Sequence, residues 1–286
     1  MTTAKMLEKT PTSQLVSRED RGKWWRFTGL MIFTFIILIP VLATVALSLR
    51  PEPSSGESGS VTMSNFVFVI TETFTPIWLG NSIWVALVTV LIAVAVSAPA
   101  GYVLSRGRSK LVSGYALALF IIQALPIIVL VVPLFMLFAP LRLIDNLVGI
   151  TIIYVGSTMS VTTWMMAAYF DTIPISLEEA AWIDGCSMFG GFVRIVLRNS
   201  LPGVLSAAIF AFLQAWNDYL IAIVFLRSDP TLTLQVGLQT FFQQNSTAWG
   251  PVMAISVIMI LPPVIVFATL NRYFSVGGIG GSLAGR

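Results

Sequence analysis

Residues 27–49 read FTGLMIFTFIILIPVLATVALSL, an apolar run that contains no charged side chain. A helix needs about 20 apolar residues to cross the hydrocarbon core of a bilayer, so this run is long enough to span it. Five more candidate spans follow along the chain: Ile77–Leu104, Leu111–Phe138, Leu147–Phe170, Leu201–Leu226 and Val252–Leu270. Only Asp218 brings a charge into any of these runs. The sequence therefore predicts an all-α integral membrane protein with six transmembrane helices.

The composition of the 286-residue chain favours the same class, because 56% of its residues are hydrophobic, 10% are charged and the mean hydropathy is +0.88. A soluble domain carries about 25% charged residues. These values exclude a disordered, fibrous or nucleic-acid-binding chain and make the lipid bilayer the expected environment. The chain has no histidine and a single cysteine, Cys186, which excludes an internal disulfide and a cysteine metal cluster. The first 26 residues are polar and basic without a signal-peptide pattern, so we expect residues 27–49 to remain as an anchor.

Lysine and arginine are distributed unequally among the predicted connections between spans. One side carries 13 of them: Lys5, Lys9, Arg18, Arg21, Lys23, Arg26, Arg106, Arg108, Lys110, Arg194, Arg198, Arg272 and Arg286. The other side carries three: Arg50, Arg142 and Arg227. Cytoplasmic loops hold the excess of positive charge in membrane proteins. We therefore expect a multi-pass protein with both termini in the cytoplasm, which an even number of spans requires.

Two pairs of prolines fall inside predicted spans. Pro126 and Pro133 lie in the third run, and Pro262 and Pro263 lie in the sixth. Proline removes a backbone donor from the helix and clashes with the preceding turn, so we expect bends at these positions. Either helix packing or a role in gating would explain such bends.

Residues 171–200 read DTIPISLEEAAWIDGCSMFGGFVRIVLRNS, a connection on the predicted cytoplasmic side that is far longer than two membrane helices need. Ser176 and Glu179 have the spacing of a capping box, which predicts the start of a short helix. Gly185 stands where that helix should end, in a conformation with positive φ. A second helix with one apolar face should follow from Phe189. The segment therefore predicts a helix-turn-helix loop that projects from the membrane.

This loop resembles the EAA loop of ABC importer permeases. The likeness rests on Glu179-Ala180-Ala181, on Asp184-Gly185 and on Ile195-Val196-Leu197 at the expected distance. Further motifs of the MalG-like carbohydrate permeases follow in the right order: Gly80-Asn81-Ser82, Trp216-Asn217-Asp218-Tyr219, Trp249-Gly250, Leu261-Pro262 and Asn271-Arg272-Tyr273-Phe274 with Gly277, Gly281 and Gly285. The family usually has proline directly after Leu197, where this chain has Arg198, and only the later Pro202 is kept.

The resemblance implies a division of the chain and a set of partners. Residues 1–26 and 275–286 would be cytoplasmic tails, residues 27–76 the first span with an outer loop, and residues 77–274 the permease core. Partners would be two copies of a cytoplasmic ABC ATPase, a second and different permease, an extracytoplasmic solute-binding protein and a sugar, all in the cytoplasmic membrane of a bacterium or archaeon. The ATPase would dock on loop residues Glu178, Glu179, Ala180, Ala181, Asp184, Gly185, Met188 and Phe189.

Asp218 is the ionisable group within a predicted span, and such residues generally face a cavity or a partner. Trp216, Asn217 and Tyr219 accompany it, and aromatic rings beside a carboxylate and an amide can bind sugars. We therefore predict that these four residues line the substrate pathway. The alternatives are a hydrogen bond between helices and an aromatic belt position at the membrane interface.

The sequence contains no G-x-x-x-x-G-K-[ST] motif, so ATP and magnesium are expected on the partner ATPase and no cofactor or metal on this chain. The absence of histidine and of carboxylate pairs within the spans argues against catalysis in the membrane. An ion-coupled secondary carrier is the alternative class, but it would need more charges within the spans. A non-sugar solute such as a glycerol-phosphate ester is the alternative substrate for the same kind of subunit.

Overall fold

The computed structural model describes residues 23–51, 61–242 and 248–278, and the regular elements in these ranges are helices without a strand. The predicted N-terminal tail lies outside the described residues up to position 22, and its last residues already belong to the first described helix. The last helix likewise continues to Gly278, beyond the predicted core boundary at 274. Gly281 and Gly285 of the family-like ending lie outside the described residues.

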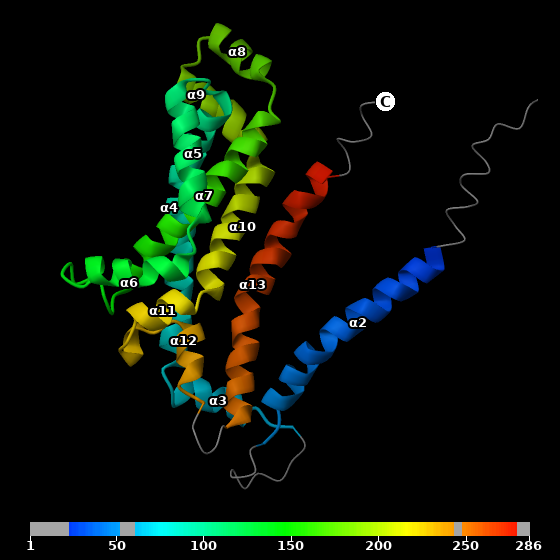
Figure 1. Ribbon diagram of the computed structural model, residues 1–286. Coiled ribbons are helices and arrows are strands. Elements are labelled where there is room, and N and C mark those ends of the chain that lie inside the picture. Colours follow the sequence, from blue (N-terminus) through cyan, green and yellow to red (C-terminus); the bar gives the residue numbers. More distant parts are fainter. Residues whose placement is uncertain (1–22, 52–60, 243–247, 279–286) are drawn as a thin grey trace, which may run out of the picture.

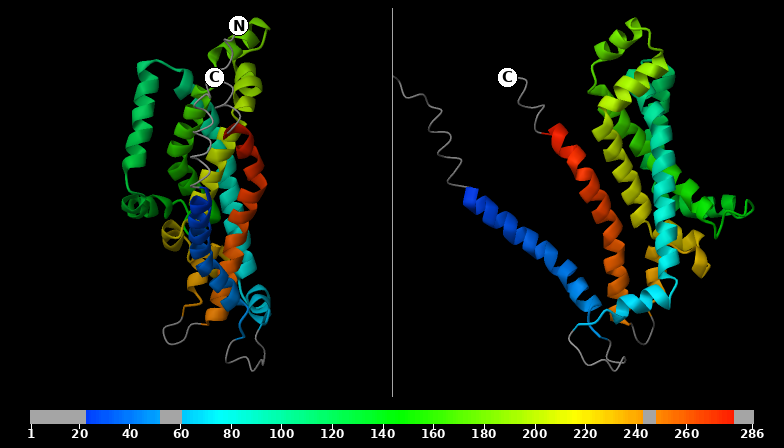
Figure 2. Two further views of the ribbon diagram at one scale, coloured as in Figure 1. Left: turned by 90° about the vertical axis from the view of Figure 1, so that its right-hand side faces the viewer. Right: turned by 180° about the vertical axis from the view of Figure 1, so that it is seen from behind.

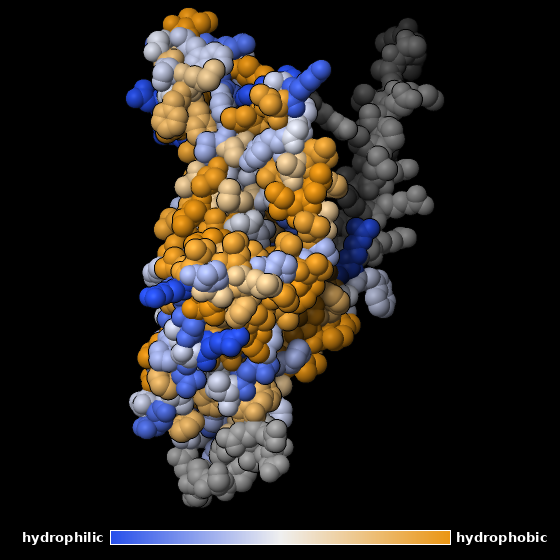
Figure 3. All heavy atoms as spheres, turned by 60° about the vertical axis from the view of Figure 1, so that its left-hand side comes forward, coloured by the Kyte–Doolittle hydropathy of each residue, from blue (hydrophilic) through white to orange (hydrophobic). Residues whose placement is uncertain are grey.

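Within the described ranges, four helices are long and apolar enough to cross a membrane. They are α2 (Lys23–Ser48), α4 (Thr75–Arg106), α7 (Leu147–Asp171) and α13 (Trp249–Gly278). Helix α4 continues through Pro99, and α13 continues through Pro262 and Pro263. In Figure 3, apolar side chains dominate the middle of the visible face, as a bilayer requires. The all-α prediction is confirmed for the described residues, with four spans, or up to six if two bent pairs of helices each count as one.

The first bent pair is α5 (Lys110–Ala124) and α6 (Ile127–Phe138), whose axes differ by 96°. The break falls at Pro126, as the sequence predicts, but it is complete and α6 runs sideways from the bundle (Figure 1). Leu125 is extended because the residue before proline is disfavoured in the helical region. Pro133 lies within α6 without ending it.

The second bent pair is Met188–Leu197 with Leu201–Asn217, whose axes differ by 80°. A further break interrupts the fifth predicted span. The prediction of one helix over 201–226 is wrong, because α10 (Leu201–Asn217) ends at Asp218 and a short α11 (Leu220–Phe225) follows. Asp218 is extended, and its carboxylate accepts hydrogen bonds from the backbone N–H groups of Ile221 at 3.1 Å and Ala222 at 3.2 Å. A carboxylate that caps α11 in this way favours the break over a continuous helix.

Helix α4 forms the centre of the bundle and packs along α7 and α10. The contact with α7 is close, because a Cβ built on Gly101 would lie 2.7 Å from Met166 Cβ and 3.0 Å from the backbone N of Ala167. Helix α2 packs instead against α13 and lies apart from the rest of the bundle (Figure 2). The most apolar part of α2 is 0% buried inside the chain, so the surface of this helix faces lipid or another subunit.

At the end of the bundle that carries α3 (Ser64–Thr71), α4 holds the segment that follows α11. This segment contains η2 (Asp229–Thr231) and α12 (Leu234–Gln239). Asn81 Nδ2 donates to the carbonyls of Pro230 at 2.9 Å and Leu232 at 2.8 Å, and Ser82 Oγ accepts from Leu234 N at 2.8 Å. The asparagine–serine motif at the start of α4 therefore anchors this segment.

Candidate functional site

The loop between α7 and α10 lies beyond the ends of these helices, at the top of Figure 1. It contains α8 (Ile175–Ile183), α9 (Met188–Gly191) and the π-helical turn η1 (Phe192–Leu197). The predicted capping box is wrong, because α8 begins at Ile175 and the preceding Pro174 caps it without a side-chain bond. Ser176 therefore lies inside the first turn, where its hydroxyl is not at the capping position.

The end of α8 agrees with the sequence prediction. Gly185 has φ of +87°, a left-handed conformation that glycine adopts at little cost. The N–H of Cys186 donates to Ala181 O at 2.9 Å and the N–H of Gly185 donates to Trp182 O at 3.0 Å. This pair of bonds is a Schellman motif, which ends the helix and turns the chain toward α9.

The eight loop residues predicted to dock an ATPase divide into two groups. Glu179, Ala180, Asp184, Gly185, Met188 and Phe189 are exposed, whereas Glu178 and Ala181 are buried against the chain itself. The exposed group adjoins Ile183, which is 86% exposed, and Met188 and Phe189 are 67% and 73% exposed. Ile183 is not among the residues predicted to dock, although an isoleucine directly before Asp184-Gly185 in a polar loop is a visible signal.

The buried face of α8 is held to α4 by Glu178, whose side chain is 1% exposed. Arg106 donates from Nε to Glu178 Oε1 at 2.8 Å, and its Nη2 lies 2.7 Å from the same oxygen. The Tyr102 hydroxyl donates to Oε2 at 2.6 Å. Glu178 therefore fixes α8 to the end of α4.

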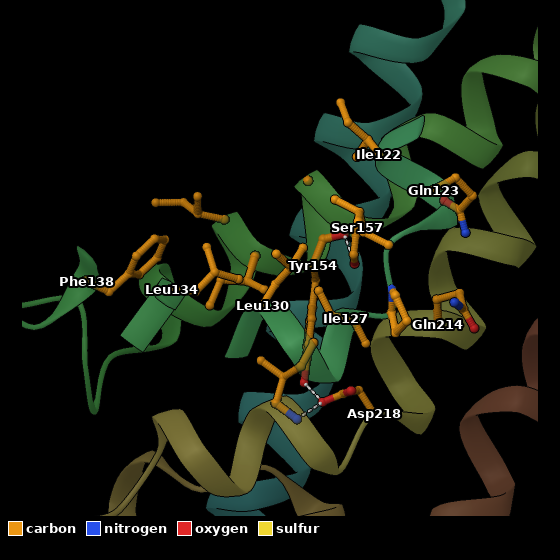
Figure 4. Close-up of a pocket in the computed structure, with 16 residues that line it drawn as sticks. Ile122, Gln123, Ile127, Leu130, Leu134, Phe138, Tyr154, Ser157, Gln214 and Asp218 are labelled. Atoms are coloured by element: carbon orange, nitrogen blue, oxygen red, sulfur yellow. Dashed lines mark hydrogen bonds between the residues drawn. The ribbon is translucent and has the colours of Figure 1, made fainter. Parts of the chain in front are cut away.

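A cavity of about 620 Å³ lies at the two helix breaks (Figure 4). Its walls come from the end of α5, from α6, from the middle of α7, from the end of α10 and from the start of α11. Most of the lining is apolar, and the polar exceptions are Gln123, Tyr154, Ser157, Gln214 and Asp218. Two amides, two hydroxyls and a carboxylate in an apolar pocket form a set that can bind a neutral, hydroxyl-rich molecule.

Asp218 is the predicted pathway residue that lines this cavity. Its Oδ2 accepts from the Tyr154 hydroxyl at 2.7 Å as well as from the two N–H groups of α11. No described residue donates to Oδ1. Asp218, at the end of α10, therefore bonds to both α7 and α11 through Oδ2, and its Oδ1 is left for another donor.

The other predicted pathway residues lie elsewhere. Trp216 is 2% exposed and stacks on Phe212 in the core, with ring centroids 5.7 Å apart. Tyr219 packs against the same core, and Asn217 is exposed at the end of α10. None of the three lines the cavity. Gln123, Ser157 and Gln214 were missed, although an uncharged polar residue in an apolar span is itself a signal.

Asp145, in the connection between α6 and α7, joins that connection to the segment after α11. It accepts hydrogen bonds from Arg227 N at 2.9 Å, from Ser228 N at 3.0 Å, and from the hydroxyls of Ser228 and Thr231. Burial, the largest single influence, would raise the pKa of Asp145, but the hydrogen bonds from Ser228, Thr231 and Arg227 together hold this pKa below its usual range. The ionised carboxylate of Asp145 thus links the connection after α6 to the segment after α11, and both of these helices border the cavity.

Apolar spanning helices, a helical loop that projects from one end and a polar-lined cavity within the bundle define a membrane-embedded transport component. The chain belongs to the family described as binding-protein-dependent transport system inner membrane component, whose model matches residues 97–276. It is therefore part of a transporter and not an enzyme.

Known relatives extend over most of the chain. The arabinooligosaccharides transport system permease protein AraQ of Halalkalibacterium halodurans is 30% identical over 286 residues, covering 96% of this chain and 100% of the relative. The trehalose/maltose transport system permease protein MalG of Thermococcus litoralis is 31% identical over 267 residues, covering 90% and 95%. A chain from the crystal structure of a bacterial ABC transporter that imports alginate shares the fold, with a TM-score of 0.72 and 22% identity over 95% of this chain and 100% of that one.

Proposed function

We propose that this chain is a permease subunit of an ATP-driven importer and forms half of the pathway for a sugar. The relatives named for arabinooligosaccharides and for trehalose and maltose support this substrate class. The cavity supports it as well, because Gln123, Gln214 and Oδ1 of Asp218 offer donors and acceptors for hydroxyl groups. An extracytoplasmic binding protein delivers the sugar, and a second, different permease supplies the other half of the pathway.

The observation that carries the docking part of the proposal is the exposed face of α8 and α9. Ile183, Met188 and Phe189 are large apolar side chains on a loop beyond the spanning helices, where the described part of the bundle leaves them exposed. Contiguous exposed apolar groups mark interaction sites. We assign this face to the cleft of a cytoplasmic ATPase, of which two copies bind ATP and magnesium and drive the assembly.

This assignment sets the orientation. The α8 end faces the cytoplasm, as the excess of lysine and arginine on that side also indicates, and the α3 end faces outward. Helices α5 and α6 then count as one span and α10 with α11 as another, which makes six spans and places both termini in the cytoplasm. In the transport cycle, ATP binding closes the ATPase dimer and moves α8, and the spans change from inward-open to outward-open to receive the sugar.

Affinity purification of the tagged chain from its own membranes tests the proposal. We expect a P-loop ATPase and a second permease to co-purify, and ATP-dependent uptake of oligosaccharide once the binding protein is added. Ile183→Asp should abolish retention of the ATPase, because a carboxylate would have to be desolvated in the cleft. The matched control is Val61→Asp, which alters a residue 69% exposed at the opposite end and should retain the ATPase.

Two results would contradict separate parts of the proposal. If no ATPase co-purifies with the wild-type chain, the importer assignment fails. If the ATPase binds but no oligosaccharide stimulates ATP hydrolysis in the presence of the binding protein, the sugar assignment fails and the importer assignment stands.

A further inference from the structure

The polar contacts between α8 and the spanning helices converge on one side chain. Both oxygens of Glu178 are bonded to α4: Oε1 accepts from Arg106 and Oε2 accepts from Tyr102. Within the described part of the chain, no other polar side chain of α8 bonds to a spanning helix. Among the described polar side chains of α8, Glu178 is therefore the one that attaches this helix to the bundle.

Arg106 is itself held in a defined position. Its Nη2 donates to Ile173 O at 3.0 Å, and its Nη1 donates to Ser105 Oγ at 3.0 Å. Ser105 Oγ in turn donates to Asp171 Oδ1 at 2.5 Å. The ends of α4 and α7 are thus joined in the network that holds α8.

Tyr102 connects this network to the rest of the loop. Its ring lies 4.8 Å from that of Phe192 in η1 and 6.5 Å from that of Phe170 in α7, measured between centroids. Phe170 and Phe192 also contact each other edge to face at 6.0 Å. The hydroxyl of Tyr102 bonds to α8 while its ring packs on η1, so both halves of the loop meet at α4.

At its far end, α4 holds the outer segment after α11. Trp78 Nε1 donates to Asp229 O at 2.7 Å, and Asn81 and Ser82 bond to the backbone between Pro230 and Leu234. The outermost of these attachments, Trp78 and Arg106, lie 28 positions apart on the 32-residue helix α4. At a rise of about 1.5 Å per residue, the helix connects points roughly 42 Å apart.

A buried ion pair is weak evidence for net stability, because desolvation of both charges offsets their attraction. Its geometry, however, is specific: two donors of Arg106 approach one oxygen while Tyr102 holds the other. Charge-assisted bonds of this kind resist a change of angle more than apolar contacts do. This contact is therefore suited to transmit a displacement of α8 to α4.

We propose that Glu178, Arg106 and Tyr102 form the link through which movement of α8 enters α4 and reaches the outer segment held by Trp78, Asn81 and Ser82. They are positioning residues of the transport cycle, and they act after the ATPase has docked. The inference rests on the proposed function, because it requires an ATPase that moves α8. It differs from the docking assignment in that the link lies on the buried face of α8.

The test uses the complete assembly with its ATPase and binding protein in proteoliposomes, and it measures ATPase retention, ATP hydrolysis and sugar transported per ATP. Glu178→Gln removes the charge with little change of volume. We expect the ATPase to remain bound and to hydrolyse ATP, while transport per ATP falls by about 5- to 150-fold, the range of typical coupling between two sites. Glu179→Gln alters the adjacent residue on the exposed face and should instead reduce ATPase retention. Glu72→Gln, at the outer end, is the matched control and should change neither quantity.

A milder variant covers the case in which Glu178→Gln reduces insertion or folding. Tyr102→Phe removes one hydrogen bond and keeps the ring against Phe192, and it should lower transport per ATP while the ATPase stays bound. Wild-type transport per ATP in Tyr102→Phe and in any folded Glu178→Gln would overturn the inference. Loss of the ATPase from Glu178→Gln would also overturn it, because the pair would then only maintain the docking loop. If even the wild-type chain binds no ATPase, it is the proposed function that fails.

Discussion

Replacement of Asp218 by alanine should destabilise the bundle at the cavity, and the structure sets the size of the effect. The change removes the cap of α11, which costs about 0.5–2 kcal/mol. It also leaves the hydroxyl of Tyr154, a residue only 2% exposed, without its partner, and an unsatisfied buried group of this kind costs about 1–3 kcal/mol. Together these contributions predict a loss of about 1.5–5 kcal/mol in the free energy of unfolding. Hydrogen bonds between membrane helices average about 0.6 kcal/mol, which favours the lower end of this range.

Two further variants separate the contributions. Asp218→Asn keeps an oxygen that accepts from the N–H groups of Ile221 and Ala222, so it should cost less than alanine. Tyr154→Phe removes the hydroxyl, and Asp218→Ala in that background no longer leaves it unpaired. The double variant should therefore be less destabilised than the sum of the two single variants.

Thermal and denaturant unfolding of the purified protein in detergent, followed by tryptophan fluorescence, measures these differences. Sugar uptake in proteoliposomes provides the second measurement. If Oδ1 of Asp218 contacts the sugar, Asp218→Asn should raise the KM for uptake by more than its small loss of stability explains. The stabilising role of Asp218 would be refuted if the losses of stability in Tyr154→Phe and Asp218→Ala were strictly additive. It would also be refuted if the Asp218→Ala protein were as stable as the wild type.

The remaining predictions concern the two ends of the bundle. Gly185→Val should strain the turn after α8, because φ is +87° there, and should reduce ATPase retention and uptake. Gly185→Asn should keep both, because asparagine tolerates positive φ. Normal uptake by the valine variant would mean that the loop is only a connector. In a Cys186→Ser background, an impermeant thiol reagent should label Thr71→Cys but not Ser109→Cys in intact cells, and labelling at position 109 would overturn the orientation. The carboxylate of Asp145, whose pKa is lowered in the folded protein, should stabilise it fully above its ordinary pKa of about 3.9 and lose this effect as the pH falls toward the folded pKa. Asp145→Asn should therefore lower the unfolding temperature at pH 7 but have little effect in strong acid, and an equal loss at both pH values would contradict this role.

The class of protein could be predicted from local sequence because its signals are local. Charge-free runs of about 20 residues have one stable environment, a bilayer, whatever their neighbours are. The end of α8 was equally predictable, since Gly185 satisfies a conformational need within a few residues of itself. The order of the EAA-like loop and the later motifs identified the family, which the match over residues 97–276 confirms.

The tertiary structure decided which face each side chain presents. Glu178 and Glu179 are adjacent and chemically the same, yet Glu178 is bonded to α4 and Glu179 is exposed. The fold brings Arg106, which lies 72 positions earlier in the chain, against Glu178 alone. Asp218 was predictable as unusual, but its three donors come from α7 and from a helix break that propensity alone does not show. The sequence predicts Trp216 in the pathway, but packing against Phe212 buries it. Periodicity and composition determine what a segment can bury, whereas contacts between distant segments determine what it does bury.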